Sequence, residues 1–132
     1  MKNMKKILSF ALVVVSVLAI ALPALAAGYD AYLGPGTSSA YNIRHGQNNA
    51  RVYNLQTMLV YAGYNPGSVD GIFGDQTDSA VRRFQRTYGL SADGIVGEDT
   101  KECLYMALGE TIPSSCVYVD PYTPSDNLEE WN

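Results

Sequence analysis

The chain has 132 residues, of which nine are Lys or Arg and 13 are Asp or Glu, and its formal net charge is −4. This length suits one domain with short additions and excludes a large multidomain enzyme, because a domain usually takes roughly 100–150 residues. Binding to nucleic acid or to an anionic membrane depends on neutralising phosphates, so an acidic chain is a poor candidate for either partner.

Residues 1–26 have the pattern of a secretory signal peptide. Three lysines precede an apolar run of 16 residues, and a small-x-small site ends at Ala26. A retained membrane anchor is the alternative, although the run is shorter than the roughly 20 residues of a membrane-spanning helix. We expect cleavage after Ala26, which removes the three lysines and changes the formal net charge from −4 to −7. No membrane partner is expected after cleavage.

Two terminal segments lack any apolar periodicity. Residues 27–43 are rich in Gly, Tyr, Ser and Ala, and residues 109–132 contain prolines and end in mostly acidic residues. Such compositions favour loosely held chain over packed structure. We therefore predict a flexible N-terminal arm over 27–43, an acidic tail over 109–132, and a folded unit over 44–108.

Within the folded unit, three stretches carry apolar side chains at intervals of three and four, which places them on one face of a helix. A glycine follows each stretch, at Gly63, Gly89 and Gly109, where a left-handed C-cap is expected. The pattern predicts an all-α fold, a small three-helix bundle. The three faces consist of Val52, Leu55, Met58, Leu59 and Ala62; of Thr77, Ala80, Val81, Phe84 and Tyr88; and of Thr100, Cys103, Leu104, Ala107 and Leu108.

The connections between these helices carry an internal repeat. Residues 68–77 and 91–100 agree at Ser, Asp, Gly, Ile, Gly and Thr, 23 positions apart. Each copy predicts an Asp-Gly turn with glycine at positive φ, followed by a Gly-acid-x-Thr helix start. We expect both apolar residues that follow each turn, Ile72-Phe73 and Ile95-Val96, to point toward the core. These pairs are also candidates for a short extended bridge between the two loops.

The motifs follow one another in a fixed order and spacing over residues 44–104. They are Arg44-x-Gly46, Val52-x-x-Leu55-Gln56-x-x-Leu59, Gly63-Tyr64, Asp70-Gly71-Ile72-Phe73-Gly74-x-x-Thr77, Ala80-Val81-x-x-Phe84-Gln85, Gly89-Leu90 and Asp93-Gly94-x-x-Gly97-x-x-Thr100. In this order they resemble the peptidoglycan-binding domain family of the short three-helix type, which is found attached to cell-wall hydrolases and carboxypeptidases. The resemblance implies a noncatalytic module that binds bacterial peptidoglycan and is associated with the cell wall.

The sequence departs from the family pattern in two ways. Asp75 and Glu98 follow the glycine of each helix start, where the family often has proline, and their charge favours the helix start through the helix dipole. The family's domains are commonly fused to a catalytic domain, whereas here only short arms flank the module. We therefore expect no catalytic domain in this chain.

Aromatic and basic residues near the first repeated loop are the binding candidates. Tyrosine offers a ring for stacking on sugars and a hydroxyl for hydrogen bonds, and Arg82 and Arg86, four apart on one helix face, are suited to carboxylates of a stem peptide. The alternatives are half-buried structural tyrosines and a solvated arginine face. We place a shallow groove between Asp70–Gly74 and the second helix, with the candidates Tyr64, Asp70, Phe73, Arg82, Gln85, Arg86 and Tyr88.

The residues offer little for catalysis. His45 is the only histidine, so neither a zinc site nor a histidine-activated nucleophile is expected, and the resemblance implies no cofactor. Paired carboxylates among Asp70, Asp75 and Asp78 remain the enzymatic alternative, that of a weak cell-wall hydrolase, although turn formation and helix starts explain the same residues. The other alternative is an adaptor or inhibitor that binds a secreted cell-wall enzyme through its arms.

Cys103 and Cys116 are the only cysteines. In an exported chain, two cysteines favour a disulfide, which here would close a loop of 14 residues and contribute roughly 3 kcal/mol in the chain-entropy model. The alternative is a pair of reduced thiols, with Cys103 as a core residue. We predict the Cys103–Cys116 disulfide.

Overall fold

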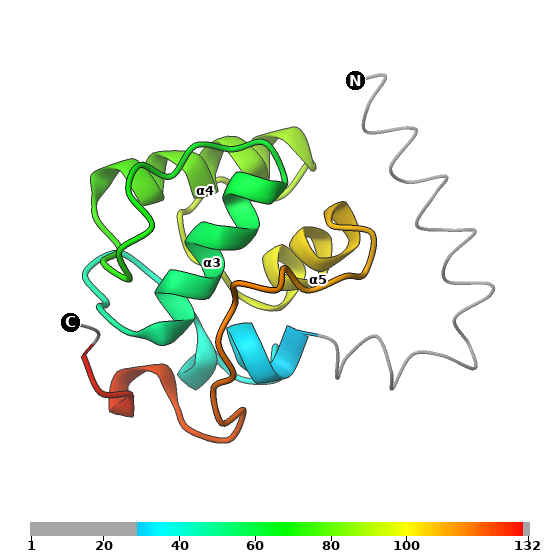
Figure 1. The fold of residues 1–132 in the computed structure, drawn as a ribbon. Helices are drawn as coiled ribbons and strands as arrows, with labels where there is room; N and C mark the ends of the chain where they lie inside the picture. Colours follow the sequence, from blue (N-terminus) through cyan, green and yellow to red (C-terminus); the bar gives the residue numbers. More distant parts are fainter. Residues whose placement is uncertain (1–28, 131–132) are drawn as a thin grey trace, which may run out of the picture.

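The computed structural model describes residues 29–130, so the predicted signal peptide lies outside the described residues. Three α-helices form the body of this part, α3 (Ala50–Tyr61), α4 (Asp75–Thr87) and α5 (Glu98–Ala107), as Figure 1 shows. Short 3-10 turns, η1 (Ser39–Tyr41) and η2 (Ser125–Asn127), lie in the flanking segments, and residues 29–33 are also helical. The predicted all-α three-helix class is confirmed.

Each helix ends at the predicted glycine. Gly63, Gly89 and Gly109 have φ angles of 91°, 73° and 67°. The residue after each glycine donates its N–H back to a carbonyl five positions earlier, as Tyr64 does to Leu59 at 2.8 Å. This is the Schellman arrangement, which satisfies carbonyls that the end of a helix would otherwise leave unpaired. Each chain reversal is thereby fixed by local chemistry.

The helix starts differ in how they are capped. The side chain of Asn49 accepts a hydrogen bond from Val52 N and caps α3. The helices α4 and α5 follow Gly74 and Gly97 without a side-chain cap. Both instead carry two acidic residues in the first turn, which complement the positive end of the helix dipole.

Only one residue of each apolar pair after the turns reaches the core. Phe73 and Val96 are 1% and 0% exposed, whereas Ile72 and Ile95 are 51% and 39% exposed. Neighbouring residues of extended backbone point to opposite sides, so both members of a pair cannot face inward. The expected bridge between the loops is also wrong, because Ile72 pairs with Asn48, and Val96 with Ile43.

The N-terminal arm lies packed against the bundle, which differs from the flexible arm that we predicted. Leu33 and Ile43 are fully buried in the core, and the Tyr29 ring meets Tyr105 of α5 edge to face at 6.0 Å. Val119 of the tail donates to the carbonyl of Ala31 at 2.8 Å, so the arm and the tail lie side by side in Figure 1.

The tail is held by polar side chains of α3, which also differs from the loose tail that we predicted. Asn54 donates to the carbonyl of Val117 at 2.7 Å, and Arg51 donates to the carbonyl of Asp120 at 2.9 Å. Both α3 side chains are fully buried. Such contacts join single polar side chains to irregular backbone, so they leave no apolar period in the sequence.

The two cysteines are free thiols in the structure, so the predicted Cys103–Cys116 disulfide is absent from it. Both side chains are half-buried and pack against the hydrophobic core. Burial raises the pKa of each thiol to about 11, with nearby Glu102 and Asp99 adding to the effect on Cys103.

No helix within residues 29–130 is long and apolar enough to cross a membrane.

Candidate functional site

A buried glutamine of α3 holds the first Asp-Gly loop, Asp70–Gly74, through hydrogen bonds. The amide nitrogen of Gln56 donates to the Ile72 carbonyl at 2.9 Å, to Thr77 Oγ1 at 3.0 Å and to Asp70 Oδ1 at 3.2 Å. Its Oε1 accepts from the backbone N–H groups of Asp70 and Gly71 at 3.0 and 2.8 Å. The fully buried Gln56 therefore joins the loop to the first turn of α4.

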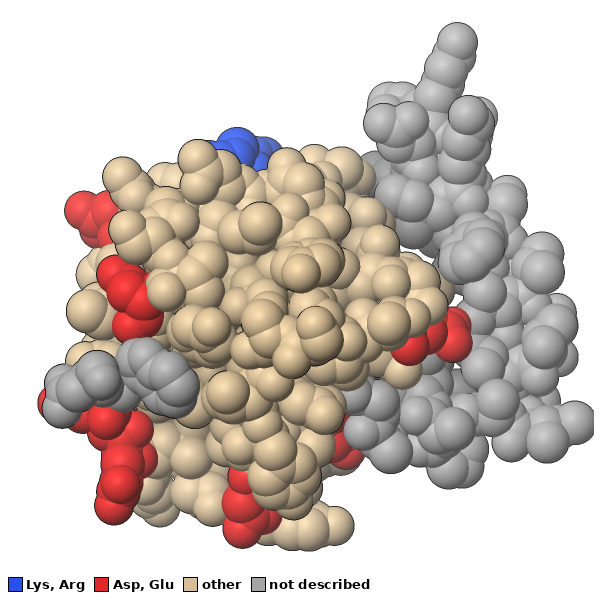
Figure 2. All heavy atoms as spheres, in the orientation of Figure 1, with Lys and Arg blue, Asp and Glu red and all other residues tan. Residues whose placement is uncertain are grey.

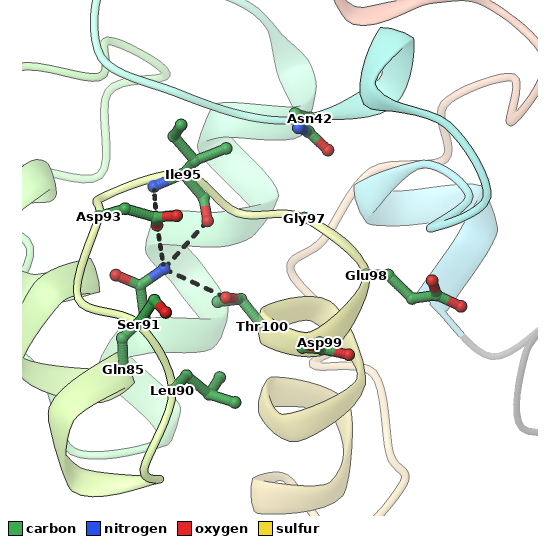
Figure 3. A pocket seen from close by; sticks show the side chains of 10 residues that line it. All are labelled: Asn42, Gln85, Leu90, Ser91, Asp93, Ile95, Gly97, Glu98, Asp99 and Thr100. Carbon is green, nitrogen blue, oxygen red and sulfur yellow. Dashed lines mark hydrogen bonds between the residues drawn. The ribbon is translucent and has the colours of Figure 1, made fainter.

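A second glutamine repeats this arrangement under the second loop, Asp93–Gly97. Gln85 of α4 donates to Asp93 Oδ1 at 3.0 Å, to the Ile95 carbonyl at 2.9 Å and to Thr100 Oγ1 at 3.2 Å. Figure 3 marks these hydrogen bonds as dashed lines. Its Oε1 accepts from Gly94 N at 3.0 Å. We call each set a glutamine clamp. The two clamps hold the two loops in the same form.

The loop aspartates build the turns. Asp70 accepts a hydrogen bond from Ile72 N, and Asp93 accepts one from Ile95 N, each at 2.9 Å. The glycine that follows the aspartate in each turn has a positive φ, 78° for Gly71 and 75° for Gly94, as the Asp-Gly pattern predicted. Both carboxylates also receive the clamp amide, so the geometry explains these acids without catalysis.

A pocket of about 330 Å³ lies at the start of α4. The guanidinium of Arg83 closes one side of it by donating to the carbonyl of Asn65 at 3.1 Å. The pocket is next to the helix that we expected to border the groove, but residues 65–67, rather than Asp70–Gly74, form its other wall. Its lining carries both charge signs, two side-chain amides and one hydroxyl: Asn65, Gly67, Asp75, Gln76, Ser79 and Arg83.

A second pocket, of about 380 Å³, occupies the equivalent place at the start of α5. Asp93, Glu98 and Asp99 make it acidic, and no basic residue lines it, which Figure 3 lets the reader follow. Glu98 and Asp99 stand 23 positions after Asp75 and Gln76 of the first pocket, so the internal repeat extends to the two pockets. The full lining is Asn42, Gln85, Leu90, Ser91, Asp93, Ile95, Gly97, Glu98, Asp99 and Thr100.

His45 borders the first pocket through Asp75. Its Nε2 lies 3.0 Å from Asp75 Oδ1, and its ring meets Phe73 edge to face at 6.3 Å. Both members of the pair are exposed. No pattern in the sequence indicates this contact, because the partners are 30 positions apart.

Phe73 and Gln85, two of the predicted binding residues, are each only 1% exposed. Phe73 belongs to the hydrophobic core, and the side-chain amide of Gln85 is hydrogen-bonded to the second loop and to Thr100. A ligand on the surface does not reach side chains buried in this way. We therefore revise their expected role from ligand contact to support of the loops.

Tyr64 and Tyr88 are half-buried around Phe84. The ring of Tyr64 meets Phe84 edge to face at 5.3 Å, and Tyr88 stacks on it at 4.4 Å. Burial raises the pKa of Tyr88 above its usual value, with Tyr64 and Cys103 adding to the effect. The partly structural reading of the tyrosines therefore fits both residues, while their outer edges remain accessible.

Arg82 and Arg86 of α4 have different surroundings. Arg82 donates to Asp78 Oδ2 at 3.0 Å and to the Ala92 carbonyl at 2.9 Å, which ties it to the second loop. Arg86 is exposed. The predicted pairing of Arg82 with Arg86 on a carboxylate would therefore require Arg82 to leave its present partners.

Residues 29–130 contain no group of three His, Cys, Asp or Glu side chains placed to hold a metal ion. Figure 2 shows one face of the molecule, on which carboxylates are spread around the rim and basic atoms lie only at the upper edge.

Residues 48–104 match the family described as "Putative peptidoglycan binding domain". The chain is 43% identical over 65 residues to a spore cortex-lytic enzyme of Bacillus cereus, a match that covers 49% of this chain and 25% of that protein. It is 50% identical over 54 residues to an N-acetylmuramoyl-L-alanine amidase of Mycobacterium tuberculosis, covering 41% of this chain and 13% of the relative. The chain thus spans about a quarter or less of these two relatives.

Among solved structures, the chain is similar to a peptidoglycan-binding protein from Clostridioides difficile, crystallised with glutamine hydroxamate. The identity is 40% and the TM-score is 0.51, over 56% of this chain and 47% of that one. This likeness and the family match concern the same part of the chain, in which residues 48–104 are similar to peptidoglycan-binding domains.

The structure reveals one functional element that sequence reasoning did not identify, the clamp role of Gln56. The signal was present as an apolar residue followed by glutamine in each of the first two helices, at Leu55-Gln56 and Phe84-Gln85. These pairs are 29 positions apart, whereas the loops are 23 apart, so a search at one fixed offset does not find them.

Proposed function

We propose that this protein is a noncatalytic, exported module that binds bacterial cell-wall peptidoglycan. The observation that carries the proposal is the family match over residues 48–104, which contain both loops, both clamps and all of α4. The named relatives are cell-wall lytic enzymes, and the part that they share with this chain is this domain. The predicted signal peptide over residues 1–26 supports export to the wall.

We assign binding to the surface around the first pocket and α4. The pocket presents Asp75 and Arg83 together with amides and a hydroxyl, which suits a stem peptide that carries both carboxylates and amines. Tyr64, Tyr88 and Arg86 extend the accessible surface along the same helix and the turn before it. Of the other sequence candidates, Asp70 and Arg82 frame the two loops, while Phe73 and Gln85 support them from below.

The first test is retention of the chain on purified peptidoglycan from which teichoic acid has been removed. We expect retention well above that of an unrelated acidic protein. Replacing Arg83 by Gln should lower retention severalfold, because it removes the charge at the pocket and the bond to the Asn65 carbonyl. Arg44→Gln is the matched control, since Arg44 pairs with Asp126 of the tail and does not line the pocket.

Three outcomes distinguish the proposed binding function from its alternatives. Retention equal to that of the acidic control protein would overturn the proposal. Equal losses for Arg83→Gln and Arg44→Gln would move the binding surface away from the pocket. Release of dye from labelled peptidoglycan in the same samples would identify a hydrolase instead of a binding module.

A further inference from the structure

Lys101 of α5 is a buried lysine that forms no ion pair with an acid among residues 29–130. Its side chain is 0% exposed. The Nζ donates to the carbonyls of Pro35 at 3.1 Å and of Tyr41 at 2.7 Å, both in the N-terminal arm. A buried ammonium normally requires a charged partner, because its desolvation is costly. The fold therefore places an amine where a cation is unfavourable.

The number of acceptors fits a neutral amine. An ammonium has three N–H donors, whereas a neutral amine has two, and two carbonyls accept from Nζ. In the neutral form both donors are paired and no charge is buried. In the protonated form a third donor and a full charge must be accommodated in the same place.

The neighbouring charges shift the pKa of Lys101 in opposite directions. Burial, the largest cause, and the guanidinium of Arg51 on α3 together lower the pKa of Lys101 to about 7. Asp30 of the arm acts in the other direction, and burial raises the pKa of Asp30 itself. Arg51 is also fully buried, and its Nε has no hydrogen-bond partner among the described residues. Two basic groups therefore share one interior site beneath the arm.

Residues 34–42, which we call the strap, connect Lys101 to the second pocket. The strap packs closely on the start of α5, since a Cβ added at Gly36 would lie 2.9 Å from the Cα of Glu98. At the end of the strap, Asn42 lines the second pocket beside Gly97, and Ile43 then pairs with Val96 in the second loop. One wall of that pocket thus depends on the strap.

We propose that Lys101 is a proton-operated latch, which holds the strap on α5 as a neutral amine and releases it when the amine gains a proton. The free strap allows the ammonium to be hydrated, which the docked strap prevents. Release removes Asn42 from the second pocket and opens the arm over the buried basic pair. Protonation of Lys101 thereby couples the pH of the solution to the conformation of the second loop.

The direction of the pH effect follows from the lowered pKa. The docked state takes up a proton at a pKa of about 7, and the released state near the ordinary value of 10.5. The released state therefore binds more protons between these values, and strap docking weakens as the pH falls through this interval. Above 10.5 and below about 7 the contribution of Lys101 to docking no longer changes with pH.

The test measures hydrogen exchange of the full chain by mass spectrometry, with rates corrected for the intrinsic effect of pH. Between pH 9 and pH 7 we expect protection of residues 34–43 to fall by up to about tenfold per pH unit, while protection of α4 stays constant. Lys101→Met should abolish this pH dependence, because methionine fills the same space without titrating. Arg86→Met, which removes an exposed charge, should retain it.

A direct titration of Lys101 in the unmodified chain tests the proposal even if the Lys101→Met variant does not fold. The Cε resonance of Lys101, followed by NMR in the unmodified chain and assigned by its absence from the Met variant or by sequential connectivity, should titrate far below 10.5. Titration at the ordinary value would overturn the proposal. So would strap protection that is equal at pH 7 and pH 9, or a pH dependence that persists in Lys101→Met.

Discussion

Two single side chains, Gln56 and Gln85, determine the form of the two loops. Each makes hydrogen bonds through both ends of its amide, and each lies where water does not reach it. A buried donor or acceptor without a partner costs about 1–3 kcal/mol, so removing one amide exposes several groups to that cost at once. The hydrogen bonds of the two buried glutamines therefore hold the loops in their conformation.

Replacing Gln85 by Ala should destabilise the protein by about 2–4 kcal/mol, because the N–H of Gly94 and the carbonyl of Ile95 lose buried partners. Gln56→Ala should have a similar effect through the first loop. Gln76→Ala, an exposed residue of α4, is the control and should change stability by less than about 0.5 kcal/mol. Urea denaturation followed by circular dichroism measures all three. A Gln85→Ala variant as stable as the control would show that the clamp is dispensable.

At this scale the sequence predicts turn chemistry better than side-chain partners. The positive φ of Gly71 and Gly94 follows from the Asp-Gly pairs, because glycine adopts this conformation without steric cost. The buried position of Gln85 does not follow from its type, since glutamine is usually exposed. Its burial becomes understandable only when the loop carbonyl and N–H groups that it pairs with are seen in space.

Among the elements, the helices were predictable and the arms were not. The apolar faces of α3, α4 and α5 repeat at helical spacing and end at glycine, so both their extent and their ends follow from the sequence. The arms dock through a few buried apolar side chains, such as Leu33 and Val119, that do not recur at helical spacing, and through Arg51, which binds backbone carbonyls of the tail. A contact between one side chain and an irregular backbone has no sequence period.

Thiol reactivity reports whether the tail remains docked on α5 and α3. Burial raises the pKa of Cys103 and Cys116 from 9.0 to about 11, so at pH 8 the reactive thiolate is roughly a hundredfold scarcer than for a free cysteine. Both thiols should react slowly with a disulfide reagent in the native chain and rapidly in denaturant. The rate should rise with pH up to about 11.

Two other results are informative for the same experiment. No titratable thiol in denaturant would mean that the cysteines form the disulfide predicted from the sequence. Rapid native reaction of Cys116 alone would mean that the tail leaves the bundle in solution, against the docking through Asn54 and Val117.

At the scale of the whole molecule, the net charge opposes the proposed function. The chain has a formal net charge of −4, and peptidoglycan carries carboxylates on its stem peptides, so the long-range interaction between them is repulsive. In the proposed binding mode, attraction comes from short contacts in the first pocket and along α4, where Arg83 and Arg86 offer positive charge. One small site binds weakly, and repeated sites on the polymer compensate through avidity.

This balance predicts an unusual salt dependence for wall retention. Raising the ionic strength from about 0.01 M to 0.15 M shortens the Debye length from about 30 Å to about 8 Å, which screens the distant repulsion more than the contacts within the pocket. Retention on purified peptidoglycan should therefore hold constant or rise over this range. In Arg83→Gln the short attraction is weaker, so the relative rise should be larger. A steep fall in retention with added salt would show instead that the arginines bind by long-range attraction, and the pocket would lose its role as the source of affinity.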